Sequence, residues 1–169
     1  MSTALLKFDG RSNKELFALI GATLTELRRR GVVRSSNNPI ADYAELLFQV
    51  AFALSPAPRS TKGYDAIGRD GVKYEIKARR LTSHNQSRQL SAIRGLEEKH
   101  FHFLGGILFN EGFSVFRACL VPHSQIRPPY ATFVARTNSW KFCLEDRVWS
   151  LPGVVDATAM IKRAEAAHS

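Results

Sequence analysis

Hydrophobic residues recur at helical spacing in two stretches near the start of the chain. Ser12 and Glu15 form an S-x-x-E capping box, and the apolar positions after them keep a period of three to four residues up to the basic run 28–30. A second, more apolar stretch begins at Pro39 and continues to about Leu54. The pattern predicts two helices in the first third of the chain.

Strand patterns dominate the middle of the chain. The stretch 63–80, GYDAIGRDGVKYEIKARR, reads as a β-hairpin. Two more strands are predicted within 101–109 and 113–122, joined by a turn at 110–112. The remaining predicted elements are a helix entered through Gly95 or Lys99, a helical turn after Pro122, strands near 131–136 and 140–144, and a final helix from about Asp156. This order, in a chain of 169 residues, predicts one mixed α/β domain spanning 1–169.

Two registers are open to the hairpin. A three-residue loop, 69–71, with Gly71 left-handed, sets Asp65 across from Glu75, whereas a two-residue turn would set Asp65 across from Ile76. A slip of one residue exchanges the two faces of a strand, so the side-chain pattern discriminates between them. The three-residue loop separates an apolar face, with Tyr64, Ala66, Val72, Tyr74, Ile76 and Ala78, from a polar face, with Asp65, Ile67, Lys73, Glu75, Lys77 and Arg79. We therefore expect the three-residue loop.

The polar face of this hairpin has two interpretations. Side chains directly opposite each other in a ladder lie about 5 Å apart, so the carboxylates of Asp65 and Glu75 could converge on one hard cation. Lys77, two residues after Glu75, would then compensate part of the negative charge. Alternatively, Lys73 and Lys77 pair with the acids on an ordinary solvated sheet.

The second predicted helix carries a narrow polar stripe on an otherwise apolar surface. Asp42, Glu45 and Gln49 stand at positions i, i+3 and i+7. In a helix this apolar, the stripe either faces a polar cavity or is simply the solvent side.

The amino-acid composition indicates which kind of binding partner and which cellular compartment to expect. The formal net charge is +9, which favours a polyanionic partner but also fits a basic protein without one. The two cysteines stand in apolar segments and predict core residues rather than a disulfide. No stretch has the length of a membrane span, and the first residues do not resemble a signal peptide, so we expect a cytoplasmic protein without membrane contact.

The residues of the hairpin and the polar stripe resemble the PD-(D/E)XK nuclease superfamily, the restriction-endonuclease-like proteins. The resemblance rests on Glu45 in an early helix, Asp65 on the first hairpin strand, and 75–77, Glu-Ile-Lys, on the second. The run from the second helix through STKGYDAI, YEIKARR and QLSAIR is also similar to a family of small uncharacterised bacterial proteins assigned to that superfamily. Two features depart from the pattern: Tyr64 replaces the proline, and no clear strand precedes Asp65.

The resemblance implies a fold and a set of roles. The fold would be a restriction-endonuclease-like mixed β-sheet flanked by helices. Asp65 and Glu75, with the backbone carbonyl of Ile76, would bind Mg²⁺, with Mn²⁺ as an alternative ion. Lys77 would orient or activate the attacking water, and Glu45 would act in the outer shell or at a second metal.

The same resemblance implies DNA as the substrate, although the motif does not separate DNA from RNA. The polar connection after Lys77 offers donors for phosphates; alternatively, it is simply a solvated loop. The predicted nucleic-acid-binding residues are Arg79, Arg80, His84, Asn85, Gln86, Arg88 and Gln89. We expect an Mg²⁺-dependent endodeoxyribonuclease that acts as a homodimer, because one centre cuts one strand. The alternative is a catalytically inactive DNA-binding or accessory subunit of the same fold.

Overall fold

The computed structural model describes residues 8–35, 38–58 and 61–168. Its three α-helices are α1 (Asn13–Arg29), α2 (Pro39–Phe52) and α3 (Thr158–Ala167). Helix α1 begins with the predicted capping box, in which Ser12 and Glu15 exchange hydrogen bonds. Helix α2 begins after Asn38 and ends at Ala53, whose left-handed φ of 51° stops the helix near the predicted place. None of these described helices is long and apolar enough to cross a membrane.

The strands form one six-stranded sheet and one small hairpin. The large sheet has the order β1-β2-β3-β4-β5-β8, and β6 pairs with β7 alone. The strands are β1 (Ser55–Pro56), β2 (Ala66–Ile67), β3 (Lys73–Arg80), β4 (Phe103–Phe109), β5 (Val115–Pro122), β6 (Ala131–Val134), β7 (Ser139–Phe142) and β8 (Val155–Asp156). Only β3 and β4 are parallel; the other pairs are antiparallel. The predicted mixed α/β class is confirmed, and the strand missing from the sequence pattern is the two-residue β1.

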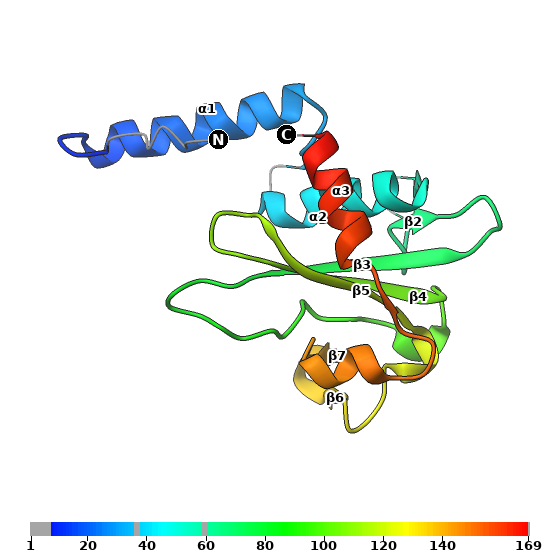
Figure 1. Cartoon of the computed structure of the whole chain (residues 1–169). Coiled ribbons are helices and arrows are strands. Elements are labelled where there is room, and N and C mark those ends of the chain that lie inside the picture. The colour runs from blue at the N-terminus through cyan, green and yellow to red at the C-terminus, as the bar shows by residue number, and fades with distance from the viewer. Residues whose placement is uncertain (1–7, 36–37, 59–60, 169) are drawn as a thin grey trace.

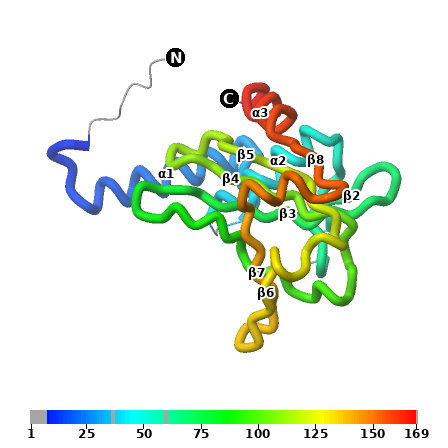
Figure 2. Tube along the Cα trace, turned by 60° about the horizontal axis from the view of Figure 1, so that its bottom comes forward, coloured from blue at the N-terminus to red at the C-terminus, as the bar shows by residue number. Residues whose placement is uncertain are grey.

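Helices α2 and α3 cover one face of the large sheet, and the β6–β7 hairpin covers the other (Figures 1 and 2). On one face, α2 and α3 enclose a core that includes Phe48, Ile107 and Ile161. On the other, β6, β7 and the short 3₁₀ turns enclose a core that includes Leu104 and Phe142. Strand β4 is buried on both sides, which explains its nearly continuous run of apolar residues. These two layers make a single domain.

The predicted helix near Gly95 or Lys99 is wrong. The connection between β3 and β4 contains only a 3₁₀ turn, Leu96–Glu98, bounded by left-handed residues at both ends. Upstream of that turn, the backbone of Leu90 and Ile93 bonds to β7, with N–H groups donated to the carbonyls of Phe142 at 2.9 Å and Trp140 at 3.0 Å. Sheet partners thus satisfy the backbone groups that a helix would have paired internally.

Both cysteines were predicted to be core residues, and this holds for Cys119 but not for Cys143. Cys119 is buried and Cys143 is half-buried, and both are free thiols. Burial raises the pKa of Cys119 to about 12 and also raises the pKa of Cys143. Both thiols therefore stay protonated at neutral pH, as inert packing residues do.

The tight packing of β4 against its two layers predicts an effect of a single methyl group. A Cβ added at Gly106 would lie 2.8 Å from Cδ1 of the fully buried Leu144. We expect Gly106→Ala to lower the free energy of unfolding by about 1–3 kcal/mol, because the core must move to accept it. Gly112→Ala, where a Cβ would meet no atom within 4 Å, should change it by less than about 0.5 kcal/mol. Equal denaturation midpoints for the two variants would contradict this packing.

Candidate active site

The hairpin adopts the predicted three-residue loop. The N–H of Gly68 donates to the carbonyl of Val72 at 2.8 Å, and Gly71 has a φ of 80°. Strand β2 pairs with β3 as Ala66 with Tyr74 and Ile67 with Lys73. The same register, continued by one residue, sets Asp65 across from Glu75, as predicted.

One residue of the predicted apolar face lies on the other side. Tyr64 packs with the core beneath β6 and β7, and the ammonium of Lys73 lies 4.9 Å from the centre of its ring. The prediction assumed a strand that already included position 64, but β2 begins only at Ala66. The strict alternation of sides does not extend to a residue outside the ladder.

Just before β2 begins, the side chain of Asp65 takes over the hydrogen bonding to β3. Its Oδ2 accepts a hydrogen bond from the N–H of Ile76 at 2.7 Å, while its own backbone carbonyl accepts from Ala57 at 2.9 Å. The side chain is thereby fixed along the edge of β3 instead of being free to rotate in solvent.

The ammonium of Lys77 lies among three oxygen atoms. It forms an ion pair with Oε1 of Glu75, lies 3.7 Å from Oδ2 of Asp65, and donates to the backbone carbonyl of Ile76 at 3.3 Å. The side chains are largely buried, with exposed fractions of 17% for Lys77, 26% for Asp65 and 14% for Glu75. Lys77 therefore pairs with the acids, but not on the solvated face that the alternative interpretation assumed.

Two of the three residues in the polar stripe of α2 border a cavity. A space of about 340 Å³ is bordered by Asp42 and Glu45 of α2, by Asp65, and by Arg34 from the loop before the helix. The guanidinium of Arg34 forms an ion pair with Glu45, whose side chain is 16% exposed. Gln49, the third member of the stripe, is not among the residues that border this space.

Arg34 is a component of the site that the sequence analysis missed. Besides its contact with Glu45, its backbone N–H donates to Oδ2 of Asp42 at 2.9 Å, as does the N–H of Ser35 at 2.8 Å. These bonds hold the loop against the first turn of α2. The sequence does show an arginine shortly before a helix with acids in its first turns, which could have suggested an ion pair. Which acid it pairs with, however, depends on the path of the loop, because Glu45 is eleven residues away.

Burial and neighbouring charges shift the pKa values of the site residues. Burial raises the pKa of Glu45 to about 7, and the charge of Asp65 adds to the rise. Burial also raises the pKa of Glu75, with Lys77 opposing it and Asp65 reinforcing it. Burial alone would lower the pKa of Lys77, but the charges of Asp65 and Glu75 outweigh it, so its pKa is raised. The ammonium of Lys77 therefore stays protonated beside the two acids.

The atoms predicted to hold a metal are compatible with Mg²⁺. All are hard oxygen donors, two carboxylates and one carbonyl, and one cationic group already contacts all three. No group of three or more His, Cys, Asp or Glu side chains suited to a metal occurs within the described part of the chain. The predicted donor set contains only two carboxylates, and Mg²⁺ usually completes its coordination with water.

The predicted nucleic-acid-binding residues fall into two groups. Arg80 and His84 are exposed, although the guanidinium of Arg80 also lies 4.6 Å from the ring centre of Phe113. The others have structural contacts: Arg79 with the carbonyl of Ser87, Asn85 with the N–H of Ser87, Gln86 with the carbonyl of Thr82, Arg88 with Asp146, and the backbone N–H of Gln89 with Oγ of Ser87. Residues 83–87 are all exposed, so the connection is a solvated turn whose conformation these contacts hold.

Comparison with known proteins assigns no family. The sequence matches none of the protein-family models and none of the curated proteins with which it was compared. The likeness to PD-(D/E)XK nucleases therefore rests on the residues described above and stays a prediction.

The raised carboxyl pKa values predict stability that decreases with rising pH. Because Glu45 has a pKa of about 7 when folded and about 4.5 when unfolded, the folded state binds more protons between these values. The contribution of Glu45 to the free energy of unfolding should be complete below about pH 4.5 and fall by roughly 1–3 kcal/mol by pH 8. Denaturant titrations across this range measure the slope.

Glu45→Gln should flatten that slope. Glu26→Gln provides the control, because two arginines lower the pKa of Glu26 to about 2, outside the range measured. Equal slopes in the wild type and Glu45→Gln would contradict the assignment.

Proposed function

We propose that the protein is a metal-dependent endonuclease of the restriction-endonuclease-like fold that hydrolyses phosphodiester bonds of DNA. The proposal is supported above all by the position of the Lys77 ammonium, which contacts the carboxylates of Asp65 and Glu75 and the carbonyl of Ile76. These are the oxygens that would bind Mg²⁺ or Mn²⁺. A single chain segment, the β2–β3 hairpin, thus supplies both the cation ligands and a neighbouring positive charge.

In the proposed hydrolysis, the divalent ion and the side chains would have different roles. When bound, the divalent ion would supply an acidified water and neutralise charge on the phosphate. Asp65 is oriented for this by its hydrogen bond with the N–H of Ile76. Lys77, whose raised pKa keeps it protonated, would donate hydrogen bonds to the water or the phosphate and stabilise the developing negative charge.

Glu45 suits a role in proton transfer. It borders the same cavity as Asp65, and its pKa of about 7 lies near neutral pH. A carboxylate with such a pKa can both accept and release a proton at the pH of a cell. In this proposal Arg34 is a positioning residue, because it holds Glu45 through their ion pair.

The charge of the chain supports a nucleic-acid substrate. A net charge of +9 attracts phosphates, and exposed donors are offered by Arg80 at the C-terminal end of β3 and by His84 beyond it. A break in both strands needs two centres, which is the reason for proposing a homodimer.

A second candidate function is DNA binding without cleavage. It is favoured by the two ion pairs, Lys77 with Glu75 and Arg34 with Glu45, which supply partners for the acids without a metal. The two functions differ in whether a divalent ion enters the site.

Metal binding can be measured without any substrate. If Mg²⁺ binds the folded chain, concentrations near 100 times the dissociation constant should add about 2.7 kcal/mol of stability, or roughly 5–10 °C in melting temperature. Asp65→Asn should remove this shift. Asp70→Asn, at the exposed hairpin turn, should retain it, because its Oδ1 still accepts from Val72. Thermal scans in which millimolar Mg²⁺ and Mn²⁺ leave the wild type unchanged would count against a metal site.

Cleavage is tested with supercoiled plasmid, linear duplex, single-stranded DNA and RNA in the presence of Mg²⁺ or Mn²⁺. We expect the wild type to nick DNA and Lys77→Ala to lose at least ~100-fold in rate, since it removes the positive charge beside the phosphate. Lys73→Ala is the matched control: this lysine is on the same strand, but its ammonium lies over Tyr64.

The results separate the two functions. DNA binding without cleavage under every condition would favour the inactive subunit. Cleavage restricted to RNA would correct the substrate class.

A further inference from the structure

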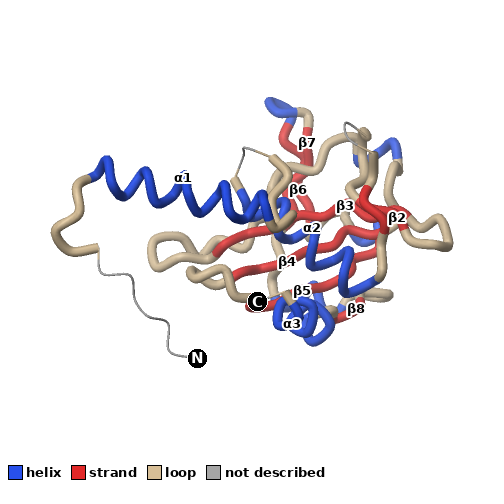
Figure 3. The backbone as a smooth tube through the Cα atoms, turned by 90° about the horizontal axis from the view of Figure 1, so that it is seen from above, coloured by secondary structure: helices blue, strands red, loops and turns tan. Residues whose placement is uncertain are grey.

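Helix α1 leaves a long apolar surface uncovered. None of its 17 residues is buried, and it extends beyond the edge of the sheet (Figure 3). Between Glu15 and Glu26 it carries ten consecutive uncharged residues, among them Phe17, which is 73% exposed, and Ile20, which is 55% exposed. A surface helix in water normally turns its apolar stripe toward a core. This stripe has no such cover among the described residues.

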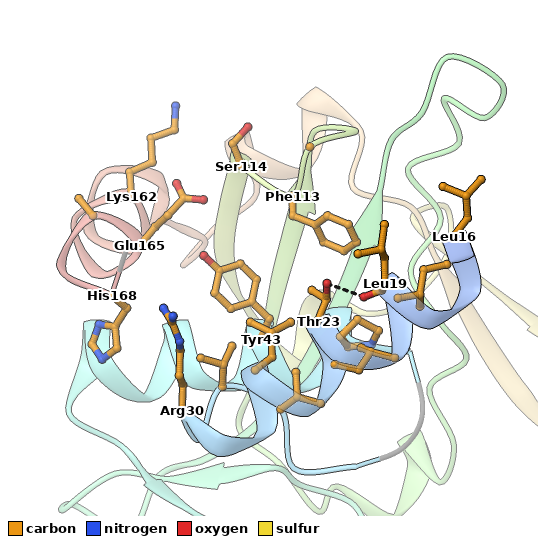
Figure 4. Close-up of a pocket in the computed structure, with 18 of the residues that line it drawn as sticks. Leu16, Leu19, Thr23, Arg30, Tyr43, Phe113, Ser114, Lys162, Glu165 and His168 are labelled. Atoms are coloured by element: carbon orange, nitrogen blue, oxygen red, sulfur yellow. Dashed lines mark hydrogen bonds between the residues drawn. The ribbon is translucent and has the colours of Figure 1, made fainter. Parts of the chain in front are cut away.

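The apolar side of α1 borders a groove on the body of the protein. The groove encloses about 1390 Å³, and its apolar border includes Leu19 and Leu24 of α1, with Tyr43 of α2 and Phe113 of the β4–β5 turn facing them (Figure 4). Its charged residues, Arg30, Lys162 and Glu165, lie near the C-terminal end of α1 and on α3. Thr25 and Ala18 point away, because at 100° per residue they fall on the opposite side of the helix.

We infer that this groove is a dimer interface, in which the apolar side of α1 from a second copy of the chain packs against the first. A 17-residue helix is about 25 Å long, so a second copy would bring an apolar side of that length to the groove. In a twofold arrangement, each helix would cover the groove of the other, so one contact surface serves both subunits.

The size and chemistry of the groove fit this occupant. The 19 residues that border it approach the 20–30 residues per side of a standard interface, which buries roughly 800 Å² on each partner. Its apolar centre and charged end follow the usual division into core and rim. A nucleic acid is a poor occupant, since the uncharged stretch offers no cation to phosphates. The inference assigns an interface to the homodimer proposed above, but it is argued from α1 and its groove alone, so a monomer would overturn it without touching the proposed hydrolysis.

The test is the mass of the full chain in solution without metal or nucleic acid. Light scattering after size exclusion, over a range of protein concentrations, should show a wild-type dimer. Ile20→Glu combined with Leu24→Glu should give a monomer, because two charges would enter the apolar contact. Thr25→Glu, on the opposite side of the same helix, should remain a dimer. Since no residue of α1 is buried, circular dichroism of the body should stay unchanged.

A milder double variant and a truncation test the same interface if the charged variant does not fold. Phe17→Ala with Ile20→Ala should weaken the dimer at least ~10-fold even if the charged variant misfolds. Removal of residues 1–7, which lie outside the described residues, should leave the dimer intact. A wild type that is monomeric at about 100 μM, far above a micromolar dissociation constant, would overturn the inference. A dimer that survives the charged variant, or one lost with residues 1–7, would do the same.

Discussion

The candidate site depends on one hydrogen-bond register, which the turn at 69–71 imposes on the β2–β3 hairpin. With Gly71 in a left-handed conformation, Gly68 pairs with Val72, and Asp65 is set across from Glu75. One residue fewer in the turn would exchange the faces of the strand. The acids would then separate, with one of them directed at the core beneath α2. The site is therefore a property of the turn as much as of the acids.

Partial burial gives these acids their chemical character. A carboxylate on an open sheet is stabilised by water and gains little from a nearby lysine. Here Glu75 and Glu45 are largely removed from water and lie near the charge of Asp65, so the pKa values of both glutamates are raised. Lys77 and Arg34 relieve part of this repulsion. The divalent ion of the proposed function would add further positive charge beside the same acids.

Sequence reasoning succeeded where the determinants are local. The hairpin register follows from the turn and from alternation over a few residues, and the capping box of α1 follows from Ser12 and Glu15. It failed where contacts with a distant part of the chain determine the local structure. In the connection at 81–102, the N–H groups of Leu90 and Ile93 bond to β7, and the predicted helix does not form. Arg34 was not predicted as a site residue for the same reason: a loop separates it from its partner Glu45. Tyr64 was misplaced since the alternation rule was applied one step outside the strand.

The irregular connection from β3 to β4 ties two remote parts of the chain into one cooperative unit. Leu90 and Ile93 share backbone bonds with β7, and Arg88 joins Arg117 of β5 through the single carboxylate of Asp146. Opening this segment must therefore break bonds to β7 and to the Asp146 bridge together. Amide protons at Leu90, Ile93 and Trp140 would therefore exchange with solvent in one concerted event, although the first two lie some fifty residues before the third in the chain.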